Sequence, residues 1–177
     1  MHDEIVVVAY DASWPQAFAA ARLGAEAALG PLAYAIEHIG STAVAGLSAK
    51  PVIDLLAGLV TFDSSRAPLP SLLAAGWQFP TDLNETLDGR RFYMRTGASG
   101  VRTHHLHLVA YDGPLWLGYL QFRDALRSSP ALAREYETLK LALADRFRDD
   151  RERYTASKTD FVTRVLGRAP PSDRRLR

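Results

Sequence analysis

Two carboxylates interrupt segments that are otherwise apolar. Asp54 lies within residues 52–56, and Glu37 lies within residues 35–39. A carboxylate in a segment patterned for burial is costly to desolvate unless something compensates its charge. Asp54 therefore binds a metal ion, pairs with a cation such as Lys50 or an arginine, or accepts several hydrogen bonds. Glu37 poses the same question, with an ion pair to an arginine as the simpler answer.

Histidines are concentrated at His104, His105 and His107. In a strand, residues two apart point to the same face, so His105 and His107 can chelate one metal ion. The alternative is a hydrogen-bonded pair beside Arg91 and Tyr93 that binds no metal. Because the chain has no cysteine, any metal must be held by His, Asp or Glu.

Arginine dominates the 21 basic residues, and the lysines are confined to Lys50, Lys140 and Lys158. A lysine kept in such a composition indicates a position where a compact ammonium is wanted. Lys140 and Lys158 border the apolar faces of their helices, and Arg123 shares a face with apolar residues. Each of these cations either covers the core with its aliphatic stem or reaches into a cleft to bind phosphate.

The loop from Gly40 to Gly46 is made of small residues, Ser41 and Thr42 among them. Such a loop can bring backbone N–H groups close to an anion, or it is simply a tight turn. It is not a Walker A motif, because five residues separate its glycines and no lysine follows the second.

Helices and short strands must position these groups. Turn residues and apolar periodicity predict a helix over 14–29, strands over 33–39 and 51–60, and a short helix over 70–75. An irregular segment over 77–89 then leads to a hairpin of strands 90–95 and 101–110, followed by helices over 115–128, 130–148 and 154–166. This order predicts one α+β domain, a mixed sheet flanked by helices with a helical C-terminal portion. In the hairpin, we expect Phe92 and Met94 to share a face with Leu106 and Leu108, which places Arg91, Tyr93 and Arg95 beside His105 and His107.

Composition limits the function classes. The chain has 177 residues, 47% of them hydrophobic, and a net charge of +1. Residues 1–167 are predicted to form a single domain and 168–177 a disordered basic tail, without which the chain is slightly acidic. Neither the charge nor any apolar segment favours nucleic acid or a membrane as partner. No secretion signal is recognisable, so we expect a cytoplasmic protein; its oligomeric state is left open.

The strings at 36–44, 49–54, 122–127, 136–140 and 154–161, with the histidine-rich strand, make the chain similar to the GrpB family. The likeness covers roughly residues 5 to 166. That family is placed in the nucleotidyltransferase superfamily and, in some bacteria, occurs fused to dephospho-coenzyme A kinase. The resemblance implies a nucleotidyltransferase-like fold that binds a nucleotide and a small-molecule substrate.

The superfamily has a Gly-Ser pair followed by an Asp-x-Asp motif that holds divalent metal, and Gly40, Ser41 and Asp54 match it. Leu56 stands where the second carboxylate is expected. Glu37, His105 and His107 would then complete the metal ligands, and histidine ligands favour Mn²⁺ or Zn²⁺ over Mg²⁺. We expect Asp54 and Glu37 to be the catalytic residues. The candidates for phosphate binding are Gly40, Ser41, Thr42, Lys50, Arg91, Arg123, Lys140 and Lys158.

Three functions follow from these expectations. The first is a metal-dependent nucleotidyltransferase acting from a nucleoside triphosphate on a small acceptor. The second is a non-catalytic nucleotide-binding or accessory module, which Leu56 and the kinase fusion favour. The third is a His/Asp metal-dependent phosphohydrolase, which requires His105 and His107 to be metal ligands.

Overall fold

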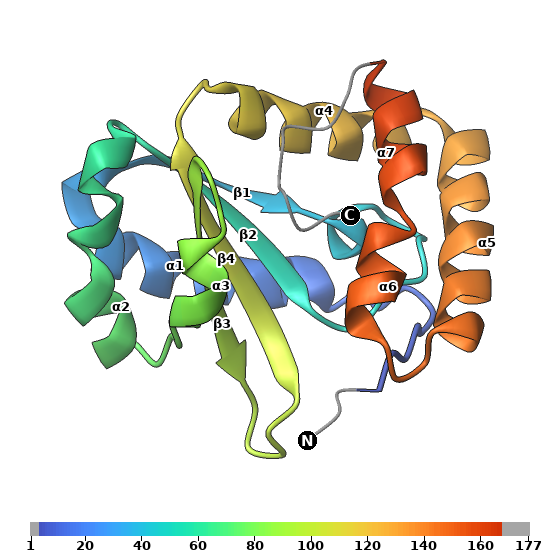
Figure 1. Ribbon diagram of the computed structural model, residues 1–177, viewed down its shortest axis with the longest axis horizontal. Helices are drawn as coiled ribbons and strands as arrows, with labels where there is room; N and C mark the ends of the chain where they lie inside the picture. The colour runs from blue at the N-terminus through green and yellow to red at the C-terminus, as the bar shows by residue number, and fades with distance from the viewer. Residues whose placement is uncertain (1–3, 168–177) are drawn as a thin grey trace.

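The computed structural model describes residues 4–167 and is built around one four-stranded sheet (Figure 1). The strands are β1 (Ala33–Ile39), β2 (Ile53–Leu59), β3 (Arg90–Thr96) and β4 (Arg102–Ala110), in the spatial order β1-β2-β4-β3. β1 pairs with β2 and β3 pairs with β4 in antiparallel fashion, whereas the central pair β2 and β4 is parallel. The sheet is therefore mixed, as the sequence predicts.

Helices cover both faces of the sheet. α1 (Trp14–Leu29) and α2 (Leu69–Ala74) lie on one face, and α4 (Pro114–Ser128) contacts β1 and β4 on the other. The C-terminal helices α5 (Pro130–Arg146), α6 (Arg151–Ala156) and α7 (Thr159–Leu166) pack together beside α4 at one side of the molecule (Figure 1). The short helix α3 (Thr81–Glu85) precedes β3. The predicted α+β class with a helical C-terminal portion is confirmed.

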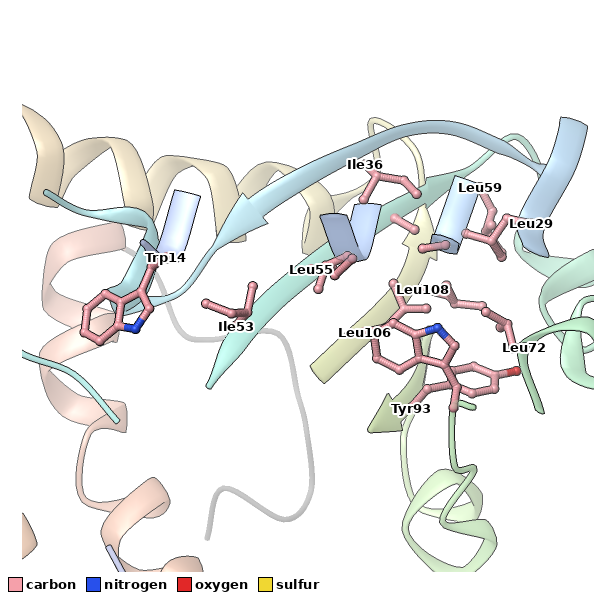
Figure 2. Close-up of a cluster of buried hydrophobic side chains, with 14 of the residues drawn as sticks. Trp14, Leu29, Ile36, Ile53, Leu55, Leu59, Leu72, Tyr93, Leu106 and Leu108 are labelled. Carbon is pink, nitrogen blue, oxygen red and sulfur yellow. The ribbon is translucent and has the colours of Figure 1, made fainter. Parts of the chain in front are cut away.

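The main core lies between the sheet and α1. Leu55, Leu106, Leu108 and Tyr93 are completely buried there, and Figure 2 shows them packed together with side chains of α1 and α2. These positions alternate along their strands with residues that face α4, because successive strand side chains point to opposite faces. Each central strand therefore supplies an apolar residue to one face and a different residue to the other.

Two local predictions differ from the structure, and a third is not tested by it. The segment 77–89 contains α3, and the helix predicted over 154–166 is interrupted, since α6 ends at Ala156 and α7 begins at Thr159. The predicted tail, 168–177, lies outside the described residues. Within residues 4–167, no helix is long and apolar enough to cross a membrane.

Candidate metal and phosphate site

Asp54 and two histidines meet on the α4 face of the sheet. The parallel register places Asp54 beside His105 and Leu56 beside His107. Asp54 Oδ1 lies 2.8 Å from His105 Nδ1. One ligand atom from each of Asp54, His105 and His107 can be chosen so that all three atoms lie within 4.8 Å of one another. The pattern of alternating residues on two parallel strands thus produces a cluster with the spacing of a metal site.

The charge states of this cluster suit a cation. Burial opposes ionisation of Asp54, but the hydrogen bond from His105, with the charges of His105 and Lys50, outweighs it and lowers the pKa of the carboxyl. Burial, with the nearby Arg90, lowers the pKa of His107 to about 3. His107 is therefore neutral at physiological pH, and its buried Nδ1 has no hydrogen-bond partner among residues 4–167. An ionised carboxylate beside a neutral imidazole is the donor set that a divalent metal binds.

Gly40 allows Asp54 to approach the loop. Its φ is +71°, and a Cβ built on it would lie 2.3 Å from Asp54 Oδ2. No other residue type fits this conformation and contact. The neighbouring Ser41 is half-buried and interacts with the Tyr136 hydroxyl. Gly40 thus lies directly at the Asp54 cluster, whereas the Ser41 side chain is engaged with Tyr136.

Two lysines lie on the other side of Asp54. Lys50 Nζ is 5.0 Å and Lys158 Nζ is 4.5 Å from the centre of the buried Tyr154 ring, so both ammonium groups make cation–π contacts with it. Burial, followed by the charges of Arg151 and Lys158, lowers the pKa of Lys50 to about 7. Burial also lowers the pKa of Lys158 to about 8, against the opposing effect of Asp54. Several cations therefore crowd around one carboxylate, and an anionic ligand would relieve their mutual repulsion.

Lys140 has a different environment. It is 2% exposed, its ammonium donates to the backbone oxygen of Ser48, and it lies 5.0 Å from the Tyr136 ring centre. The Ser48 amide in turn donates to Glu137 at 2.9 Å. Lys140 thus holds the segment that follows the Gly40–Gly46 loop. Burial, followed by the charge of Lys158, lowers the pKa of Lys140 to about 7.

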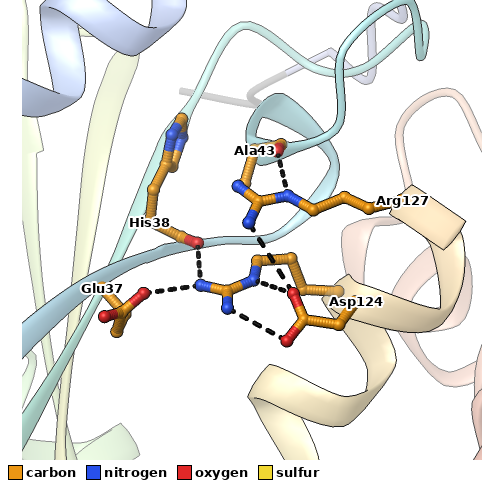
Figure 3. A network of polar contacts seen from close by, with 6 residues as sticks. Glu37, His38, Ala43, Asp124 and Arg127 are labelled. Atoms are coloured by element: carbon orange, nitrogen blue, oxygen red, sulfur yellow. Dashed lines mark hydrogen bonds and ion pairs between the residues drawn. The ribbon is translucent and has the colours of Figure 1, made fainter.

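Glu37 and Arg123 form a separate network. Arg123 donates to Glu37 at 2.7 Å, to the His38 backbone oxygen at 3.1 Å and to Asp124 at 2.7 Å (Figure 3). Arg123 is buried and fully engaged, so it links α4 to β1. Glu37 is left out of the Asp54 cluster, because its carboxylate is directed at this arginine. The ion pair considered for Glu37 from the sequence is the one that forms.

Thr42 is also committed within the fold. It is 2% exposed and its Oγ1 lies 3.0 Å from His38 Nε2, with the Val52 backbone oxygen 3.4 Å away. Its hydroxyl therefore holds the loop against β1 and the entry to β2, and it does not point to Asp54.

The hairpin register is shifted by one residue from the prediction. His107 pairs with Phe92, His105 pairs with Met94, and Leu106 pairs with Tyr93. Tyr93 and Arg91 are therefore on the α1 face of the sheet, where Tyr93 joins the core and the Arg91 guanidinium stacks 4.9 Å from the Phe62 ring. The expectation that His105 and His107 share a face is correct, whereas Arg91 lies on the opposite side from the candidate site.

Two contributors to the site did not stand out in the sequence. Tyr154 forms the surface on which Lys50 and Lys158 converge, and Arg151 Nη2 lies 3.4 Å from His105 Nε2. For Tyr154, the sequence signal is an aromatic residue four positions before Lys158. Nothing distinguishes Arg151 from the many other arginines of the chain.

The fold and site define an α+β protein with a mixed sheet and a metal-compatible Asp/His cluster beside buried lysines. The chain belongs to the GrpB family, whose description is GrpB protein and which matches residues 4–168. A UPF0157 protein of Pseudomonas aeruginosa is 43% identical over 175 residues, which covers 94% of this chain and 68% of that protein. The glutamate-rich protein GrpB of Alkalihalophilus pseudofirmus is 32% identical, with 92% of this chain and 94% of that protein covered.

Two further similarities bear on the fold and on function. The crystal structure of the conserved protein GrpB from Enterococcus faecalis superposes with a TM-score of 0.81 at 31% identity and covers 92% of this chain and 95% of that one. A dephospho-CoA kinase of Mycobacterium bovis is 28% identical over 92% of this chain, a match that spans 45% of the kinase.

Proposed function

We propose that this protein is a metal-dependent nucleotidyltransferase that transfers a nucleotidyl group from a nucleoside triphosphate to a small-molecule acceptor. The observation that carries the proposal is the juxtaposition of Asp54, His105 and His107 with the half-buried Lys50 and Lys158. The first three side chains suit a divalent cation, and the lysines suit the phosphates that such a cation accompanies. Nucleoside triphosphates are cytoplasmic substrates, so the proposal includes a cytoplasmic location.

The donor set fits a metal ion. Asp54 is ionised, and His107 is neutral with an unpartnered buried nitrogen. Asp54, His105 and His107 would hold the cation, which when bound would neutralise and align the reacting phosphate. With two imidazoles and one carboxylate, we propose Mn²⁺ or Zn²⁺ in preference to Mg²⁺.

The side chains around the cluster would bind and orient the nucleotide. Lys50 and Lys158 place two ammonium groups where phosphate oxygens can accept charge-assisted hydrogen bonds. Gly40, which has no Cβ, lets the loop pass directly beside the Asp54 carboxylate. In the transfer, an acceptor oxygen bonds to the α-phosphorus while the bond from that phosphorus to the bridging oxygen breaks. Pyrophosphate leaves with the electron pair, and the acceptor's proton passes to solvent or a basic group.

An accessory nucleotide-binding role is the second candidate. Leu56 takes the place of a second carboxylate, is completely buried and packs with Ile39, Val109 and Trp116. No rearrangement of side chains on β2 can therefore supply a second acidic ligand at this position. The similarity to a dephospho-CoA kinase favours the same role. A His/Asp phosphohydrolase is a third candidate, favoured by the proximity of both histidines to Asp54.

Product analysis separates these functions. The purified protein is incubated with ATP and Mn²⁺, Zn²⁺ or Mg²⁺, with a mixture of small hydroxyl and amine compounds as acceptors. Pyrophosphate release that Asp54→Asn abolishes is the result expected for nucleotidyl transfer. ATP binding without turnover would support the accessory module, and release of inorganic phosphate would support the hydrolase.

A pair of lysine variants tests the phosphate-binding assignment. Lys158→Met is expected to weaken ATP affinity by about 1 to 3 kcal/mol, the contribution of a hydrogen bond to a charged group, with little change in thermal stability. Lys140→Met, the matched control, is expected to lower the melting temperature because it releases the Ser48 segment. If titration calorimetry instead shows unchanged ATP affinity for Lys158→Met, Lys158 is not a phosphate ligand.

A further inference from the structure

A hollow lies beside residues 42–46 of the Gly40–Gly46 loop, and Asp54 is not among the residues that line it. Its volume is about 580 Å³, within the range of small-molecule pockets. We call it the outer pocket: its walls are residues 42–47, the corner where α4 meets α5, and Tyr10 and Pro15 at the start of α1. None of the residues assigned to metal or phosphate above lines this pocket except Thr42.

The charged residues that line the outer pocket are two arginines, Arg127 and Arg134, and one carboxylate, Glu137. Hydrogen bonds with Ser48, including the one from its backbone amide, and the charge of Lys140 keep the pKa of the Glu137 carboxyl below normal, against the opposing effect of burial. Arg127 donates through Nε to the Ala43 oxygen at 2.9 Å, and its terminal nitrogen is 3.7 Å from Asp124 (Figure 3). The exposed Arg134 guanidinium makes no hydrogen bond or ion pair with any other residue in 4–167. The pocket therefore offers one uncommitted arginine and a second with donors to spare.

Neutral hydrogen-bonding groups complete the wall. Within the described part of the chain, the amides of Ala45 and Gly46 donate no hydrogen bond. His38 uses Nε2 toward Thr42, and its ring stacks on Phe18 with centroids 4.6 Å apart. Alanine, valine, leucine and proline side chains supply the rest of the lining. The pocket thus combines apolar surface with anion-binding groups at one edge.

We infer that the outer pocket binds a small molecule with a carboxylate or phosphate group attached to an apolar part. Arg134 and Arg127 would bind the anionic group, since arginine suits carboxylate and phosphate alike. Only the loop separates the pocket from Asp54: Gly40 touches Asp54, while Thr42 and the residues after it line the pocket. The binding of this anion does not depend on the proposed function, because no residue of the Asp54 cluster lines the pocket.

Binding of two probe compounds tests the inference without metal or nucleotide. Phenyl phosphate and benzoate carry the two anionic groups on the same ring, and their affinities are measured from amide chemical shifts in NMR titrations. Amides of residues 43–47 and of the first turns of α5 are expected to shift. Arg134→Gln is expected to weaken binding about fivefold or more, whereas Arg146→Gln, on the same helix but outside the pocket, leaves it unchanged. Binding of one probe alone supports the inference and identifies the anionic group.

Two controls keep this result separate from the transfer activity. Asp54→Asn is expected to bind the probes as tightly as the unmodified protein, so the pocket can be established even if no nucleotide is turned over. Ala45→Trp places a bulky side chain from an exposed loop position into the hollow and is expected to abolish binding. Failure of both probes to bind at about 10 mM, or equal affinity of Arg134→Gln and the unmodified protein, would overturn the inference.

Discussion

The two faces of the central strands differ at the end that holds Asp54, although successive residues of each strand supply them. Further along the strands, Leu56 and Val109 make the α4 face apolar as well. On the α1 face, Leu55, Leu106 and Leu108 are completely buried in the main core. On the α4 face, Asp54 and His105 form a hydrogen-bonded pair beside His107. The same backbone therefore holds the core together and positions the ionisable groups. A buried sheet gives the cluster its rigidity, since each of its side chains is anchored by an apolar neighbour on the opposite face.

Among the substitutions that distinguish the two faces of β4, the largest expected effect is a loss of folding stability. Leu106→Ala removes a completely buried side chain and is expected to lower the free energy of unfolding by about 2 to 5 kcal/mol, measured by urea titration. Metal affinity of the folded protein should not change. His105→Gln, one residue away, is expected to weaken metal binding by roughly tenfold or more with a smaller loss of stability. Equal loss of metal affinity in both variants would show that the two faces do not act independently.

Two glycines of the same loop provide a matched test of the contact with Asp54. Gly40 and Gly46 both have positive φ, but a Cβ on Gly40 meets Asp54 whereas a Cβ on Gly46 meets nothing within 4 Å. Both alanine variants should lose about 1 kcal/mol of stability from the backbone conformation. Only Gly40→Ala is expected to weaken metal binding, by about tenfold, because it displaces the carboxylate. Calorimetric metal titration measures this effect. Unchanged metal affinity in Gly40→Ala would show that Asp54 is not a metal ligand.

How far the sequence predicts this structure depends on the element. Alternation alone placed Leu106 and Leu108 in the core and kept His105 and His107 together, because both strands are regular there. The register of β3 was wrong because the ladder shifts between Arg95 and Thr96. Such an irregularity reverses the facing of every residue beyond it and leaves no clear mark in the sequence. Tyr93 and Arg91 exchanged faces for that reason.

The candidate site was predictable where the signal was a charge in an apolar strand. Asp54 stood out in that way, and Gly40 and Ser41 entered through the family resemblance. The distinction between Lys158, which lies near Asp54, and Lys140, which holds the Ser48 oxygen, depends on tertiary packing. The sequence predicts equivalent helix edges for both lysines, but only Lys140 lies within a helix, because Lys158 directly precedes α7 at the break after α6. Periodicity places them on the same kind of face but cannot show which carbonyl or carboxylate each one reaches.

The smallest expected effect concerns His38, a polar residue on the core side of the sheet. Burial lowers its pKa to about 4, so the folded protein disfavours the protonated form that the unfolded chain takes up near pH 6.5. Stability is therefore unaffected above that pH and decreases as the pH falls toward 4. His38→Gln is expected to make this decrease shallower, by up to about 1.4 kcal/mol per pH unit. Urea unfolding at several pH values measures the slope, and identical slopes would exclude the contribution of His38.

The central claim is that Asp54, His105 and His107 bind a divalent cation, and the most direct test is to locate Mn²⁺ in crystals soaked with it. An anomalous difference map is expected to show one strong peak within about 2.5 Å of the Asp54 carboxylate and of an imidazole nitrogen. Mn²⁺ bound only at sites away from Asp54, with the Asp54–His105 hydrogen bond unchanged at 2.8 Å, would show that this cluster does not bind a divalent cation.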